Sequence, residues 1–117
     1  MSPVARSLTD TLLAHHRHVC GPHSFRPPIT DRCLITYGVL CRDAGYAGMV
    51  QGVGKYLQEV AEWCASNGWP PLNSLAINKE SRQPGDSYDV APGCSLMGWP
   101  AEADSCIVFE GYPVRVP

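Results

Sequence analysis

The residues best suited to metal chemistry crowd into one short stretch near the N-terminus. All four histidines and one cysteine fall between residues 15 and 23, at His15, His16, His18, Cys20 and His23. Zinc takes four nitrogen or sulfur ligands, and His15 and His18 have the helical spacing of a metal-binding pair. Cys20 and His23 would have to fold back across Gly21-Pro22 to join them. Structural zinc sites usually take their ligands from two pairs that are well separated in the sequence. We therefore expect a polar helix end, which suits histidine through the helix dipole, and no bound metal or other cofactor.

A cysteine nucleophile activated by histidine is the second chemistry that this stretch offers. Cys20 and Cys33 both lie near the histidines in the sequence, and a neighbouring imidazole base is what activates a thiol. A working nucleophile also needs a group that orients the base and donors for the developing oxyanion, and no motif of either kind accompanies these cysteines. We therefore expect a protein without enzymatic activity.

Four glycines form the third feature, because glycine-rich loops bind phosphate. They stand at positions 45, 48, 52 and 54. A phosphate-binding loop ends in Gly-Lys-Ser/Thr and follows a strand, and this stretch does neither. We expect Gly52 and Gly54 instead to let a helix pack closely on a neighbour, at a cost in helix propensity of about 1 kcal/mol each.

Length and charge limit the class of protein. A chain of 117 residues with 44% hydrophobic residues is the size of one packed domain. The net charge of -2 and the pI near 6.0 weaken a nucleic-acid interpretation, because neutralisation of phosphates by Lys and Arg supplies much of that affinity. No apolar run reaches the roughly 20 residues that cross a bilayer, and the N-terminus lacks the apolar region of a secretory signal. We expect one soluble, cytoplasmic domain over residues 1–117, with no membrane partner.

The six cysteines have irregular spacings and no Cys-x-x-Cys motif. Because the sequence shows no secretory signal, we expect them to be reduced and mostly buried. A disulfide framework is the alternative that their even number leaves open.

Capping residues predict two helices in the first half of the chain. Ser2-Pro3 supplies an N-cap and a proline at the first helical position, which begins a helix over the first twenty residues. Thr36 caps a short helix over 37–42. In that helix we expect Val39 and Leu40 to point inward.

A longer helix is predicted over 47–66. Its apolar face is marked, at helical spacing, by Val50, Val53, Leu57, Val60, Ala61 and Cys64. Asn67-Gly68 is a fitting C-terminal stop.

The pattern changes to a period of two after the long helix. Alternation over 74–80 predicts a strand, and the Pro-Gly pair within 82–86 predicts a turn. Residues 88–90 are a candidate returning strand that would complete a β-hairpin. The apolar run 107–109 predicts one more strand.

The predicted order of elements is that of a winged helix, in which two helices joined by a glycine-containing turn precede a hairpin. We expect an α+β fold with a winged-helix-like core over 33–90. The helix over 1–20 packs across this core, and an irregular tail over 91–117, with its one strand, covers the hairpin.

Short motifs between residues 35 and 88 carry a resemblance to a known family. They are Ile35-Thr36-Tyr37-Gly38, Val53-Gly54 within a helix, and a Pro-Leu segment running into a strand and a glycine-bearing turn. This arrangement resembles the DNA-binding domain of the alkylguanine-DNA alkyltransferases, and more closely their non-catalytic alkyltransferase-like relatives. In that family Thr-Tyr-Gly opens the first helix of the helix-turn-helix and Ala-Val-Gly lies in the recognition helix. The resemblance covers less than half of the chain and implies a winged helix that binds duplex DNA.

Two departures from the family pattern bear on activity. Where the family has Pro-Cys-His-Arg at its alkyl-acceptor site, this chain has Pro71-Leu72-Asn73-Ser74. The resemblance therefore implies no alkyl transfer. The family's recognition helix carries an Arg two residues before its Val, and here that residue is Gln51.

We expect a non-catalytic module that binds a macromolecule through the helix at 47–66 and the turn at 81–87. For double-stranded DNA, the amide of Gln51 can pair with adenine, and Lys55 and Arg42 can reach phosphates. The full set of expected DNA- or partner-contacting residues is Tyr37, Arg42, Tyr46, Gln51, Lys55, Tyr56, Lys79 and Arg82.

Two alternatives stay open from the residues alone. One is that Gln51, Lys55 and Arg42 are simply solvated surface residues, because the net charge of the chain is negative. The partner can also be a protein. A small acidic domain of this size suits an inhibitor, encoded by a phage or mobile element, of a host nucleic-acid-processing defence complex, as in the anti-CRISPR proteins.

Overall fold

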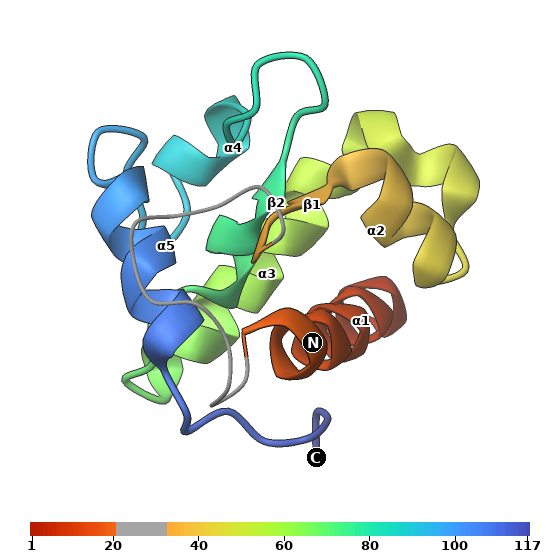
Figure 1. Cartoon of the computed structure of the whole chain (residues 1–117). Coiled ribbons are helices and arrows are strands. Elements are labelled where there is room, and N and C mark those ends of the chain that lie inside the picture. Colours follow the sequence, from red (N-terminus) through yellow and green to blue (C-terminus); the bar gives the residue numbers. More distant parts are fainter. Residues whose placement is uncertain (21–32) are drawn as a thin grey trace.

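The computed structural model describes residues 1–20 and 33–117, which form a small α+β domain built mainly of helices (Figure 1). In chain order the elements are α1 (Pro3–Val19), β1 (Ile35–Thr36), α2 (Tyr37–Asp43), the 3₁₀ helix η2 (Ala47–Gly52), α3 (Val53–Ser66), the 3₁₀ helix η3 (Leu72–Leu75), β2 (Ala76–Ile77), α4 (Asp86–Asp89) and α5 (Trp99–Val108). No helix in these two described stretches is long and apolar enough to cross a membrane.

The two capped helices in the first half are confirmed. Ser2 Oγ accepts a hydrogen bond from the Ala5 amide at 3.2 Å, and the helix begins at the following proline. Thr36 Oγ1 accepts from the Val39 amide at 3.3 Å and caps α2. Leu40 is fully buried, but Val39 is 36% exposed, so the prediction that both point inward is wrong for Val39. Neighbouring helical residues lie about 100° apart around the axis, and α2 buries one narrow side.

The long helix predicted over 47–66 is divided into two. Residues 47–52 form η2, and the α-helix begins at Val53. The apolar face is confirmed from Val53 to Cys64, whereas Val50 is 39% exposed. Two glycines within η2 weaken α-helix formation there, and 3₁₀ turns are common at helix N-termini. Gly68 has a φ of +72° just after the helix, the left-handed stop that Asn67-Gly68 predicted.

The predicted strand over 74–80 is largely wrong, because the strand covers Ala76–Ile77 alone and η3 precedes it. Every residue from 72 to 77 is buried, so the chain here is a continuous interior run rather than an alternating surface strand. β2 pairs with β1 in parallel, with Ile35 opposite Ala76 and Thr36 opposite Ile77. The predicted antiparallel hairpin is therefore also wrong.

The other two predicted strands are helices. Residues 88–90 lie at the end of α4 and just beyond it, and residues 107–109 at the end of α5. The tail over 91–117 therefore contains a helix in place of the expected strand. A proline in the first turn of α5 starts the helix, and Ala103, Cys106 and Ile107 then recur at helical spacing on its buried side.

Helices α1, α3 and α5 enclose the core together with η3. An aromatic cluster closes one end of it, where His16 and Tyr112 meet edge to face with centroids 4.9 Å apart. Tyr112 also contacts the rings of Trp69 and Phe109. All six cysteines lie in the described stretches and none forms a disulfide. Five of them are buried and Cys94 is half-buried, which confirms the expectation of mostly buried thiols.

Burial of His16 makes the stability of the fold depend on pH. Its Nε2 lies 2.8 Å from the carbonyl oxygen of Cys106. Burial lowers its pKa, partly offset by that carbonyl, and the pKa of His15 is lowered for the same main reason. Near neutral pH the folded protein therefore keeps both rings uncharged. Above about pH 6.5 the histidines of the unfolded chain are uncharged too, so their burial costs no free energy of protonation there.

We predict that the free energy of unfolding falls as the pH drops below about 6.5 towards the lowered folded pKa values, by up to about 1.4 kcal/mol per pH unit for each histidine involved. Denaturant melts at several pH values measure this slope. His16→Gln, which keeps a donor, should lose part of the slope. An unchanged slope in His16→Gln would contradict the prediction.

Candidate functional site

The parallel pairing of β1 and β2 brings two distant parts of the chain to the same edge. Parallel strands end on the same side of a sheet. Thr36 lies opposite Ile77 in the register, so the residues that follow them, Tyr37 and Asn78, leave the sheet together. Both line the groove that opens at this edge.

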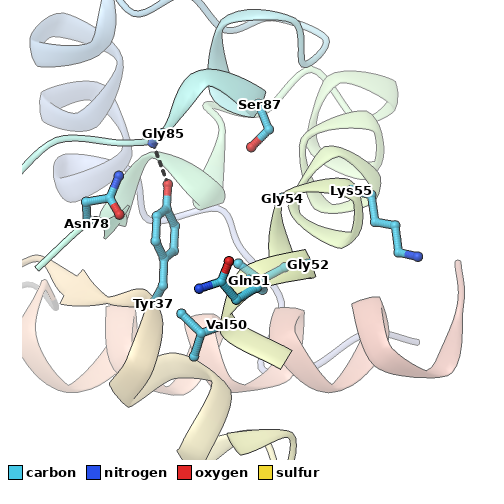
Figure 2. Close-up of a pocket in the computed structure, with 10 residues that line it drawn as sticks. Tyr37, Val50, Gln51, Gly52, Gly54, Lys55, Asn78, Gly85 and Ser87 are labelled. Carbon is cyan, nitrogen blue, oxygen red and sulfur yellow. Dashed lines mark hydrogen bonds between the residues drawn. The ribbon is translucent and has the colours of Figure 1, made fainter. Parts of the chain in front are cut away.

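The groove has a volume of about 500 Å³ and lies between the start of α2, the junction of η2 with α3, and the segment 78–87 (Figure 2). Its lining residues are Tyr37, Val50, Gln51, Gly52, Val53, Gly54, Lys55, Asn78, Gly85 and Ser87. A volume of this size is within the range of ligand-binding clefts. We take this groove as the candidate binding site.

Tyr37 joins the two sides of the groove. Its hydroxyl oxygen accepts a hydrogen bond from the Gly85 amide at 2.7 Å (Figure 2). Burial raises the pKa of this hydroxyl, and the Gly85 amide partly offsets the effect. The side chain is therefore a neutral phenol near pH 7, which fixes the position of the 78–87 segment and does not act as a base.

The segment opposite α2 is held by its own backbone hydrogen bonds. The Asn78 amide donates to the Gln83 carbonyl at 2.9 Å, and the Arg82 amide donates to the Asn78 carbonyl at 3.0 Å. Arg82 has a φ of +58°, which is uncommon for a residue with a Cβ. The chain thus reverses over 78–83, slightly ahead of the turn predicted at 82–86.

Gly54 lets α3 approach α4 closely, as the sequence predicted. A Cβ at this position would lie 2.5 Å from Ser87 Oγ and 2.8 Å from Ser87 Cβ. Next to it, Gln58 Nε2 donates to the Ser87 carbonyl at 3.4 Å. The same prediction is wrong for Gly52, because a Cβ there would meet nothing within 4 Å.

The charge of the groove differs from that of the whole chain. Its lining contains no acidic residue and one cation, Lys55, whose Nζ lies 5.0 Å from the centroid of the Tyr56 ring. Other hollows on the described surface carry acidic pairs, such as Asp10 with Asp43 or Glu59 with Glu62. Among these hollows, the groove is the one suited to an anionic partner.

Three of the residues predicted to contact a partner, Tyr37, Gln51 and Lys55, come together in the groove. The other five lie outside its lining. Arg42 is exposed and pairs with its neighbour Asp43 at 3.2 Å, an exposed contact of small energetic value. Lys79 and Arg82 are exposed on the turn, and Tyr46 and Tyr56 are half-buried.

Sequence reasoning missed Val50, Asn78, Gly85 and Ser87 as lining residues. Gly85 and Ser87 fall within 81–87, the turn predicted to contact a partner, but neither was named as a contact residue. Asn78 was placed in the strand predicted over 74–80. The parallel order of the strands decides which turn residues face Tyr37, and an alternating pattern does not reveal strand direction.

A small polar network lies beneath the groove, near the position to which the resemblance assigns the acceptor cysteine. Asn73 is buried, its Nδ2 donates to Cys94 Sγ at 3.7 Å, and its Oδ1 has no hydrogen-bond partner among the described residues. Tyr88 donates to Glu102 at 2.6 Å. Burial raises the pKa of the Cys94 thiol, which keeps it in its protonated, weakly nucleophilic form.

The histidine cluster is spread over separate contacts. His15 Nε2 lies 3.0 Å from the Cys33 carbonyl and His16 contacts the Cys106 carbonyl. His18 is exposed, and His23 lies outside the described residues. Across residues 1–20 and 33–117, no three His, Cys, Asp or Glu side chains converge to hold a metal ion.

We predict that Gly54→Ala destabilises the protein by about 1–3 kcal/mol, because the added methyl overpacks against Ser87 and outweighs the gain in helix propensity. Rotation of the Ser87 hydroxyl cannot relieve the clash, since Ser87 Cβ is also too close. Urea denaturation measures the loss. The matched control Gly52→Ala should be tolerated, and Ser87→Gly should restore part of the stability in the double variant. Equal effects at positions 52 and 54 would show that α3 and α4 are not in close contact.

Comparison of the chain with family models, with curated proteins and with solved structures found no match. The functional interpretation therefore depends on the geometry and charge of the groove.

Proposed function

We propose that this protein is a non-catalytic binding module whose groove engages double-stranded DNA. The observation that carries the proposal is the lining of the groove, which contains one cation and several neutral hydrogen-bonding side chains but no carboxylate. Phosphate contacts supply most of the affinity of DNA-binding proteins, and carboxylates at the interface oppose it. Gln51 and Asn78 offer amides, the side-chain type that pairs with the major-groove edge of adenine.

The proposed binding unit is winged-helix-like. In it α2 is the first helix of a helix-turn-helix, Gly45 with a φ of +89° is in the turn, and η2 with α3 is the recognition element. The segment 78–87, held on α2 by Tyr37, takes the place of the wing. The resemblance to alkyltransferase-like proteins supports this assignment, and with Leu72 in the place of the acceptor cysteine the proposed role is binding without alkyl transfer.

Each side chain has a distinct part in the proposed complex. Gln51, exposed on η2, reads a base edge, and Lys55 contacts a phosphate beside it. Arg42, Lys79 and Arg82 are exposed, and in the proposed complex they contact flanking phosphates. Base contacts specify sequence, whereas phosphate contacts set orientation and affinity.

A protein partner is the second candidate, favoured by two exposed apolar side chains. Val50 lines the groove and is 39% exposed, and Val39 on α2 is 36% exposed. Apolar side chains beside a polar rim are typical of protein interfaces. In this case the groove would take a side chain of the partner, as an inhibitor of a nucleic-acid-processing complex would.

We predict that a short labelled duplex binds with strong salt dependence, and that fluorescence anisotropy at about 50 and 200 mM salt detects it. Lys55→Glu should weaken binding by about tenfold and reduce the salt slope by about one. Gln51→Ala should weaken binding to a preferred sequence more than to others. Arg115→Glu is the matched control, because it makes the same charge change at an exposed position on the C-terminal tail.

The outcomes separate the two candidates. Loss of binding in Lys55→Glu with retention in Arg115→Glu supports the groove as the DNA site. Absence of binding at low salt, or equal losses in the two variants, would reject the DNA proposal. The Lys55→Glu variant and a Val50→Ser variant would then be used to test candidate protein partners.

A further inference from the structure

A small chamber adjoins the groove at the point where α2, α3, η3 and α4 meet. Tyr37, Gly54 and Ser87 line both the groove and the chamber (Figure 2). The chamber has a volume of about 10 Å³, which is about the space that one water molecule needs. It is therefore too small for any ligand larger than a single heavy atom with its hydrogens.

Asn73 lines this chamber and carries an unpaired acceptor. The residue is 2% exposed. Its Nδ2 donates to Cys94 Sγ at 3.7 Å, whereas its Oδ1 has no hydrogen-bond partner among the described residues. A buried amide oxygen without a hydrogen bond is costly, and nearly all such groups in folded proteins bond to protein or to an ordered water. A donor held in the chamber would meet this need.

The rest of the polar lining suits a neutral molecule that both donates and accepts. Tyr37 Oη accepts from the Gly85 amide at 2.7 Å, so its own hydrogen is available to donate. The Ser87 hydroxyl is a further donor and acceptor, while Gln58 Nε2 already donates to the Ser87 carbonyl. Among the described residues no acidic side chain lines the chamber, and a buried cation would need such a partner. A buried water typically makes about three hydrogen bonds, and this lining offers that number.

We propose that the chamber is a binding site for one ordered water molecule, which donates to Asn73 Oδ1 and accepts from the Tyr37 hydroxyl. The water completes a chain of hydrogen bonds that runs from Cys94 through Asn73 and Tyr37 to Gly85 on the groove wall. Asn73 is thereby a positioning residue, because it acts through the water on the side chain that holds the 78–87 segment. The proposal does not depend on the nature of the partner in the groove.

The consequence of the water is a more rigid groove wall. A hydroxyl that donates to a fixed acceptor keeps one orientation, and hydrogen bonds in a chain strengthen one another. The lone pair of Tyr37 that faces the Gly85 amide is then held in place. Without the water the Tyr37 hydroxyl loses its acceptor in the chamber, so the 78–87 segment should open more often by local unfolding.

The direct test is a high-resolution crystal structure of the full chain, combined with water-to-protein nuclear Overhauser effects in solution. We expect a water oxygen about 2.5–3.0 Å from Asn73 Oδ1. We also expect cross-peaks between water and the side-chain amide of Asn73. An empty chamber, or an Asn73 oxygen that bonds to a protein donor instead, would overturn the proposal.

Amide hydrogen exchange tests the positioning role of Asn73. Asn73→Leu replaces the acceptor by an apolar side chain of similar size. It should speed exchange at the Gly85 amide about fivefold, the factor that corresponds to one lost hydrogen bond. Tyr37→Phe removes the direct bond to Gly85 and should speed this exchange at least as much. The matched control is Ser74→Ala, at a fully buried neighbouring position outside the chamber lining, and it should leave exchange at Gly85 unchanged.

The buried amides of α1 separate this role from a general loss of stability, because their exchange reports global unfolding. In Asn73→Leu, exchange at Gly85 should rise relative to these amides. An equal rise at all positions, no rise at Gly85, or a rise in Ser74→Ala as large as that in Asn73→Leu would each overturn the positioning role. The water itself is measured in the wild-type protein, so that test holds even where Asn73→Leu fails to fold.

Discussion

Among residues 1–20 and 33–117, Ile35 with Ala76 and Thr36 with Ile77 form the whole of the sheet, and both strands run in the same direction. Each strand ends where the groove begins, so the first residue of α2 and the first residue of the 78–87 segment face one another. Tyr37 converts this proximity into a fixed geometry through its bond to the Gly85 amide. An antiparallel hairpin over the same sequence would carry these two segments to opposite ends of the strands. The groove therefore depends on the direction of four paired residues.

The sequence predicts the helices well where local chemistry decides the structure. Ser2 and Thr36 cap the helices that follow them, and Gly68 ends α3. The C-terminal half is predicted poorly for an equally physical reason. The apolar run 107–109 has the composition of a strand, but a proline in the first turn upstream starts α5, and α5 packs against η3. Tertiary contacts override β propensity there, as they do for the two-residue strand β2.

The candidate site is predictable in part. Tyr37, Gln51 and Lys55 follow from the helical pattern and the resemblance, because all three occur on elements whose start the sequence marks. Val50 was placed on the wrong side, since the apolar stripe was continued through a stretch that winds as a 3₁₀ helix with a different period. To predict the opposite wall, one must know that two segments about forty residues apart pair in parallel. No local pattern in a single sequence reveals that pairing.

Net charge is a weak guide to what this groove can bind, because four of the carboxylates make hydrogen bonds elsewhere in the fold. Glu59 accepts two hydrogen bonds at the start of α1, and Glu102 accepts from Tyr88 and the Ser95 amide. Asp89 and Asp10 each accept a backbone amide from a loop or from the C-terminal tail. These carboxylates hold the fold together at sites outside the groove lining. The potential in a groove is set by the charges that reach it, so an acidic chain can present a surface suited to phosphate.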